Sequence, residues 1–245
     1  MFSRLRHWSQ HASVRLPLLI PSSCAMCGSA GNNALCDGCR KQFFARRSHR
    51  CVQCAIPLSD TYATLCGACT RQPPAFDATI VAADYTPPVD RLVLALKFGN
   101  RLELALLMAD MLRDAALRAQ ELPLPTKMAA VPLGAQRLAE RGFNQALEIA
   151  KPLSRALGVV LDAQLALRQR ETRAQSLLHP DERQKNIRRA FIVPAKAIDA
   201  VRNAHVGVVD DVMTTGETLN ELAATLKRFG AARVTNFVFA RTLPS

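Results

Sequence analysis

The feature that most constrains this 245-residue chain is the spacing of its cysteines, because all eight fall within residues 24–69. They form four Cys-x-x-Cys pairs: Cys24 and Cys27, Cys36 and Cys39, Cys51 and Cys54, Cys66 and Cys69. One Cys-x-x-Cys turn lets two thiolates reach the same ion, and two such turns supply the four ligands of a tetrahedral zinc site. The spacing therefore predicts two structural zinc sites that leave no coordination position open for a substrate.

The spacing alone leaves the assignment of pairs to ions open. Sequential pairing gives two zinc ribbons in tandem, at residues 24–39 and 51–69, whereas a crossed arrangement lets the first and third pairs share an ion. Disulfides or redox chemistry are the competing interpretations of such cysteines. The apolar stretch 16–21 is short and interrupted by Pro17 and Pro21, so it predicts no secretion signal. We therefore expect a cytoplasmic protein with reduced thiols, which favours metal.

Charge and hydropathy narrow the remaining classes. The chain carries 32 Lys and Arg against 20 Asp and Glu, a formal net charge of +12. A basic protein attracts polyanions, which include nucleic acid and phosphorylated small molecules. No apolar run approaches the roughly 20 residues that span a bilayer, so no membrane span is expected. Pro73 and Pro74 indicate a linker, and we expect three parts: a basic arm (1–23), a double zinc ribbon (24–72) and a larger domain (73–245).

Basic residues lie around the predicted ribbons, and two phenylalanines are interleaved with them. The basic residues are Arg40, Lys41, Arg46, Arg47, Arg50 and Arg71. For the arginines we favour contact with nucleic acid over a merely solvated surface, which makes single-stranded DNA a candidate partner. For Phe43 and Phe44 we favour packing in the seam between the ribbons over stacking on bases.

Beyond the linker, strand patterns alternate with helical patterns, which is typical of an α/β fold with a parallel sheet covered on both faces. The expected strands are residues 78–85, 127–132, 206–209 and 234–240. The expected helices are residues 88–98, 102–122, 136–157 and 216–229. Gly230 is suited to end the last helix in a left-handed conformation.

The chemical centre is the sequence Val-Val-Asp-Asp-Val-Met-Thr-Thr-Gly-Glu-Thr at residues 208–218. An apolar strand delivers Asp210 and Asp211 at its carboxyl end, where ligands of open α/β sheets bind. The backbone amides and hydroxyls of the following loop, with a helix amino terminus behind them, suit a phosphate group. The two acids lie where they can accept hydrogen bonds from the vicinal hydroxyls of a ribose.

This segment resembles the phosphoribosyl pyrophosphate (PRPP) motif of type I phosphoribosyltransferases. The resemblance implies that Asp210 and Asp211 are the catalytic acids and contact the ribose 2′- and 3′-hydroxyls. It also implies that the loop and the start of the next helix bind the 5′-phosphate. The residues of that phosphate loop are Thr214, Thr215, Gly216, Glu217 and Thr218.

Three further basic groups can complete such a site. Arg137 and Arg141 are four residues apart on one predicted helix face, after the strand at 127–132, which suits a pyrophosphate group. A solvated helix face is the alternative. Lys97 is the only charge in the apolar stretch 92–98, and either reaches a phosphate or extends its ammonium to solvent.

The polar segment 168–189 is expected to be a hood over the ligand, a surface loop or a groove for DNA.

With the cysteine module in front, the order of these segments is similar to the ComF family of competence proteins over nearly the whole chain. The family is associated with the uptake and use of external DNA. Two functions follow from the resemblance. In the first, the protein is an enzyme that binds PRPP with Mg²⁺ and transfers the phosphoribosyl group to an unidentified acceptor. In the second, it is a PRPP sensor without turnover that binds DNA or a DNA-processing partner.

Overall fold

The computed structural model describes residues 22–45, 49–169 and 190–243. Its centre is a sheet with the strand order β3-β9-β8-β4-β5, in which every neighbouring pair is parallel. The strands are β3 (Ala78–Asp84), β9 (Arg233–Arg241), β8 (His205–Met213), β4 (Lys127–Ala130) and β5 (Val160–Leu161). The α/β prediction with a phosphoribosyltransferase-like parallel sheet is therefore confirmed.

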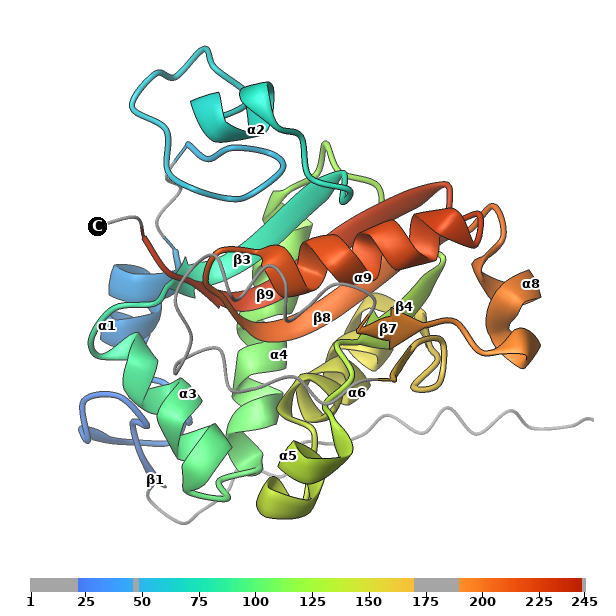
Figure 1. Cartoon of the computed structure of the whole chain (residues 1–245). Helices are drawn as coiled ribbons and strands as arrows, with labels where there is room; N and C mark the ends of the chain where they lie inside the picture. The colour runs from blue at the N-terminus through green and yellow to red at the C-terminus, as the bar shows by residue number, and fades with distance from the viewer. Residues whose placement is uncertain (1–21, 46–48, 170–189, 244–245) are drawn as a thin grey trace, which may run out of the picture.

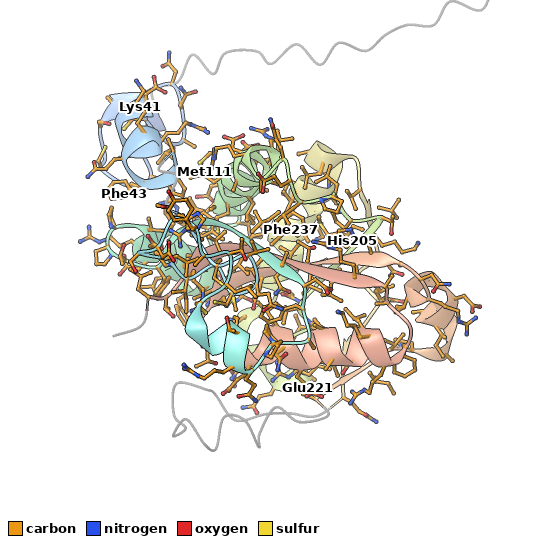
Figure 2. The ribbon with its side chains drawn as sticks, turned by 90° about the horizontal axis from the view of Figure 1, so that it is seen from above. Lys41, Phe43, Met111, His205, Glu221 and Phe237 are labelled. Atoms are coloured by element: carbon orange, nitrogen blue, oxygen red, sulfur yellow. The ribbon has the colours of Figure 1, made fainter. Side chains whose placement is uncertain are left out.

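Helices cover both faces of the sheet. Helices α4 (Glu103–Arg118) and α6 (Gln145–Leu157) pack together and against one face, while α9 (Glu217–Arg228) packs on the other, in front of the sheet in Figure 1. Apolar side chains of both layers meet the sheet in one continuous core. Figure 2 shows Phe237 of β9 in this interior. The central strands β8 and β9 are mostly buried along their length, because helices cover both faces of the sheet.

Shorter elements connect this frame. Helix α3 (Val89–Phe98) lies between β3 and α4 along the chain. Strands β6 (Leu167–Arg168) and β7 (Phe191–Ile192) pair antiparallel. A 3₁₀ turn, η3 (Ala195–Ala197), and helix α8 (Ile198–Val201) then lead into β8.

Three predicted boundaries are wrong, each for a local reason. The single helix expected at 136–157 is two helices, α5 (Ala135–Arg141) and α6, because Gly142 has φ 76° and ends α5 in a left-handed conformation. The helix expected to reach Leu122 ends at Arg118. The strand expected to end at Val209 continues as β8 to Met213, so the two acids lie within a strand. The left-handed conformation expected of Gly230 is confirmed, with φ 94°.

The cysteine module contains short elements around two separate cysteine clusters. These elements are β1 (Ser22–Ser23), β2 (Ala30–Gly31), α1 (Asp37–Cys39), the π-helical turn η1 (Arg40–Phe44) and α2 (Gly67–Arg71). Within the described residues, the first and second pairs gather in one cluster and the third and fourth pairs in the other. The sequential pairing is therefore the one that the chain adopts, and the crossed arrangement is wrong.

The module is packed onto the sheet. Phe44 is 3% exposed and its ring centroid lies 5.9 Å from that of Phe239 in β9. The prediction that Phe44 fills a seam between the two ribbons is therefore wrong, because it fills the seam between the module and the sheet. The N–H of Thr79 in β3 donates to the carbonyl of Val52 at 2.9 Å, which joins the module to the edge strand.

Part of the predicted nucleic-acid surface is used inside the molecule. Arg40 forms an ion pair with Asp114 of α4 at 2.8 Å, and Arg50 forms one with Asp84 of β3 at 2.9 Å. Lys41 points away from the sheet on the outer side of the module (Figure 2), and Arg71 is also exposed. Arg46 and Arg47 lie outside the described residues, as does the basic arm up to residue 21. Two of these arginines therefore attach the cysteine module to the larger domain.

Within residues 22–45, 49–169 and 190–243, we find no helix with the length and apolar character needed to cross a membrane.

Candidate functional site

The strand order creates a crevice between β4 and β8. These two strands are neighbours in the sheet, but the chain leaves β4 toward β5 on one side and leaves β8 toward β9 on the other. The connections after the two strands therefore diverge at their carboxyl ends. In open α/β sheets, ligands bind at this kind of switch point.

A cavity of about 270 Å³ lies at this place, and a smaller one of about 30 Å³ adjoins it at the loop after β8. Both are lined by Asp210, Thr214 and Thr218. The larger one is also lined by Asp211, Lys97, Arg137 and Arg141, and the smaller one by Thr215, Gly216 and Glu217. The structure thus brings together all ten residues that the sequence analysis assigned to one site.

Two neighbouring acids and one lysine form the floor of the larger cavity. Oδ1 of Asp210 accepts a hydrogen bond from the N–H of Asp211 at 2.9 Å. Nζ of Lys97, from α3, lies 2.7 Å from Oδ2 of Asp211, which is buried. Burial raises the pKa of Asp210 well above its usual range, and the neighbouring charge of Asp211 raises it further. The free protein therefore holds this acid pair at a cost that a ligand can offset.

The loop after β8 provides polar backbone groups beside these acids. Gly216 has φ 88°, a conformation that favours glycine, and it starts α9 directly after the two threonines. The N–H of Glu217 donates to Oγ1 of Thr215 at 3.4 Å. The first turn of α9 therefore lies against the smaller cavity, and the positive end of the helix dipole there favours anions.

Helix α5 supplies guanidinium groups on the opposite wall. Arg137 and Arg141 both line the larger cavity, as their spacing predicts. The Arg141 guanidinium lies 5.3 Å from the ring centroid of Phe98 of α3, which is 68% exposed. Burial lowers the pKa of Arg141, although it remains far above neutrality for an arginine. The contact with Phe98 holds α5 against α3 across the cavity.

Sequence reasoning did not assign three polar residues that line the larger cavity, namely Tyr85, Asn144 and Gln145. Arg168 also lines it and was expected only as part of the hood at 168–189. Asn144 caps α6 through Oδ1, which accepts from the N–H of Leu147, and its Nδ2 donates to the carbonyl of Val131 after β4. Gln145 is only 3% exposed, and its Oε1 has no hydrogen-bond partner. The Arg-Gly-Phe-Asn-Gln stretch at 141–145 was the available signal.

Each cysteine cluster has the donor set and the spacing for one zinc ion. The four Sγ atoms of each cluster lie within 4.8 Å of one another. The Sγ atoms of Cys27 and Cys36 are 3.7 Å apart, and those of Cys54 and Cys66 are 3.5 Å apart. Tetrahedral zinc with Zn–S bonds of about 2.3 Å needs sulfurs roughly 3.8 Å apart. Both clusters therefore fit structural zinc.

Backbone hydrogen bonds prepare thiolates in both clusters. Burial raises the pKa of Cys24, but hydrogen bonds from the backbone of Cys27 and Cys36 outweigh it and leave the pKa at about 6. Burial likewise raises the pKa of Cys66, but hydrogen bonds from the Cys69 backbone and the Cys54 thiol leave it at about 7. A thiolate is the form that binds metal, so each cluster has at least one thiol whose lowered pKa favours metal binding near neutral pH.

The predicted hood at 168–189 falls mostly outside the described residues, which stop at 169 and resume at 190. Its described ends are β6 and β7, and the Arg168 guanidinium lies 5.5 Å from the ring centroid of Phe191. Arg168 therefore reaches the larger cavity from the base of this segment.

Both parts of the chain match known protein domains. Residues 15–70 match the double zinc ribbon domain, and residues 144–243 match the phosphoribosyl transferase domain. The DNA utilization protein YhgH of Salmonella typhi is 36% identical over 232 residues, which cover 92% of this chain and 100% of that protein. Competence protein F of Haemophilus influenzae is 34% identical over 213 residues, which cover 85% and 91% of the two chains.

Among solved structures, the glutamine PRPP amidotransferase from B. subtilis, complexed with ADP and GMP, is similar at 18% identity and a TM-score of 0.35. The similarity covers 54% of this chain and 25% of that one.

Proposed function

The chain belongs to the family that contains the DNA utilization protein YhgH and Competence protein F, and on that premise we propose that its phosphoribosyltransferase domain binds PRPP with Mg²⁺. The ligand would occupy the two adjoining cavities at the ends of β4 and β8. One observation carries this proposal: the two cavities gather an acid pair, an amide-rich loop and four basic side chains around one crevice.

Each part of PRPP has a matching group in this arrangement. The 5′-phosphate fits the loop Thr214–Gly216 and the first turn of α9, which supply N–H and hydroxyl donors. The ribose hydroxyls fit Asp210 and Asp211, which supply acceptors. The diphosphate fits Arg137 and Arg141 across the cavity. Lys97 already forms an ion pair with Asp211, so its main role in PRPP binding would be to balance the charge of that acid.

The same groups suit phosphoribosyl transfer. A nitrogen nucleophile would form a bond to ribose C1 while the bond from C1 to the diphosphate oxygen breaks and the diphosphate leaves with the electron pair. The proton lost by the nucleophile passes to solvent. Positive charge develops on the ribose as this bond breaks, so the Asp210 and Asp211 carboxylates beneath it would stabilise the transition state. Mg²⁺ bound with the diphosphate would supply positive charge to the leaving group.

The biological setting is proposed from the relatives. Two of the similar proteins carry DNA utilization or competence in their names, so we propose that this chain acts in the uptake or use of DNA. A PRPP sensor that binds DNA or a DNA-processing partner uses the same cavity without turnover. Exposed Lys41 and Arg71 remain available for a polyanion, whereas the ion-paired Arg40 and Arg50 are not.

Ligand-induced stabilisation tests the binding site. We expect PRPP with Mg²⁺ at about one hundred times its Kd to stabilise the full chain by about 2.7 kcal/mol, which raises Tm by roughly 5–10 °C. The double variant Asp210→Asn with Asp211→Asn should lose this shift. Asp199→Asn is the matched control, since that side chain is 90% exposed on α8. An equal shift in the double variant would contradict the assignment.

Turnover is tested separately. The full chain is incubated with PRPP, Mg²⁺ and a panel of nucleobases and amines, and released diphosphate is measured. Diphosphate release that depends on both an acceptor and the acid pair supports the transferase. Binding without release from any acceptor supports the sensor.

A further inference from the structure

A buried arginine connects the second cysteine cluster to the loop after β8. Arg241 is the last residue of β9 and is 5% exposed. Its Nε donates to the carbonyl of Cys54 at 3.1 Å, and Cys54 belongs to the second cluster. Its Nη1 donates to the carbonyls of Met213 at 3.1 Å and of Thr214. One planar guanidinium thus joins a predicted zinc ligand to the start of the phosphate loop.

The position of these carbonyls fixes the direction of two loop amides. In a trans peptide the C=O and the following N–H lie in one plane and point in opposite directions. The carbonyls of Met213 and Thr214 are held toward Arg241, so the N–H groups of Thr214 and Thr215 are directed away from it. Both threonines line the small cavity that we assign to the 5′-phosphate. Rotation of either peptide would break a charge-assisted hydrogen bond to the guanidinium.

We propose that Arg241 is a positioning residue through which the second zinc site holds the phosphate loop in its anion-binding conformation. The inference rests on the proposed function for the identity of the ligand, but its effect on the loop is independent of the ligand. The first cluster has no corresponding connection among the described residues. Its neighbour Arg40 bonds to Asp114 of α4, far along the chain from the loop.

A second arginine provides a matched control. Arg50 also ties the second cluster to the end of a strand, because its Nη1 donates to the carbonyl of Ala55 and its Nη2 to Asp84 of β3, both at 2.9 Å. Neither of these partners belongs to the loop 213–216. Arg50→Lys therefore weakens the docking of the same module by the same chemical change, but leaves the loop carbonyls in place.

The first experiment compares Arg241→Lys with Arg50→Lys in the full chain. Lysine keeps the charge but lacks the rigid fork that spans the two sides. We expect both variants to retain two zinc ions. Amide hydrogen exchange of residues 213–217 in the free protein should quicken at least tenfold in Arg241→Lys, and the Kd for PRPP with Mg²⁺ should rise at least tenfold. Arg50→Lys should change both by less than twofold.

The second experiment removes one zinc ion at a time. Cys66→Ser should lose one zinc and reproduce the fast loop exchange of Arg241→Lys. Cys36→Ser should also lose one zinc but leave exchange at residues 213–217 unchanged. Equal loop exchange in the two cysteine variants, or normal loop exchange in Arg241→Lys, overturns the proposal. If Arg241→Lys loosens all of β8, the comparison of the cysteine variants decides alone.

The two proposals fail in different ways. If the wild-type chain does not bind PRPP, the proposed function fails, while loop exchange in the variants still tests the role of Arg241. If PRPP binds but Arg241→Lys leaves both loop exchange and Kd unchanged, only the positioning role fails.

Discussion

Asp210 and Asp211 occupy adjacent positions on a buried strand, and this placement is unfavourable for stability. One acid forms an ion pair with Lys97. The other has a pKa raised by burial and by the charge of its neighbour. Sites that are strained in the free protein commonly gain stability when the functional group is removed.

We predict that Asp210→Asn stabilises the ligand-free protein by about 1 kcal/mol at neutral pH, while it removes PRPP binding. The sign follows from the raised pKa. As pH rises from the unfolded value near 4 through the folded value, the unfolded chain releases its proton first, so the wild type loses stability. The variant has no carboxyl group to titrate at this position, so its gain in the free energy of unfolding over the wild type should grow with pH. Chemical denaturation at several pH values measures it, and an advantage that shrinks with pH contradicts the account.

For single residues, the sequence predicted the members of the motif well, but it did not predict the residues that hold the motif in place. Asp210, Thr214 and Gly216 were found because a strand, a polar loop and a helix start follow one another directly along the chain. Arg241 was not found, because it reaches the loop after β8 through contacts between residues that are distant in the sequence. Arg241, for example, bonds to Cys54, which is 187 residues away.

Among the elements, the break between α5 and α6 is the one that shapes the cavity. The sequence predicted one helix over residues 136–157, although α5 itself buries no residue. Gly142 ends α5 because φ 76° is accessible to glycine at little cost. The break lets Asn144 cap α6 and hold the carbonyl of Val131 after β4.

We predict that Gly142→Ala destabilises the protein by about 1 kcal/mol, because alanine is strained in the left-handed conformation. No atom lies within 4 Å of the added methyl group, so the effect comes from the backbone. Gly31→Ala is the control, since its methyl group also meets nothing within 4 Å but its φ is not positive. Urea denaturation compares the two, and equal stability of the variants would argue against the strain.

For most other elements the periodicity was sufficient. Strand β3, helix α3 and helix α9 begin and end within one or two residues of their predicted limits. These elements have apolar faces that match one structural period throughout. Strand β8 was predicted too short because its last residues include two acids, and burial of charge is not expected from a sequence pattern.

At the scale of the whole molecule, the cysteine module and the sheet share one core. Buried cysteines of both clusters, Phe44 and the strands belong to a single cluster of buried side chains. The zinc ribbons therefore serve as part of the support of the larger domain. The cysteine pairs and Pro73-Pro74 predicted a separate module joined by a linker, because packing contacts such as Phe44 on Phe239 carry no local sequence signal.

We predict that Phe44→Ala destabilises the full chain by about 3–5 kcal/mol, the usual cost of a large-to-small change in a core. The change removes the ring that packs on Phe239 between the module and the sheet. Phe43→Ala is the matched control, because that ring is only partly buried, and it should cost clearly less. Thermal denaturation of the two variants with both zinc ions bound tests this. If Phe44→Ala lowers stability no more than Phe43→Ala does, the packing of Phe44 on Phe239 is not what attaches the module to the sheet.

Binding of PRPP at the crevice between β4 and β8 can be measured by calorimetric titration of the zinc-loaded full chain. PRPP is titrated with Mg²⁺ into the wild type, into Asp210→Asn with Asp211→Asn, and into Asp199→Asn. We expect one PRPP to bind per chain, with affinity retained in Asp199→Asn and reduced at least a hundredfold in the double variant. No binding to the wild type, or equal affinity in the double variant, would contradict it.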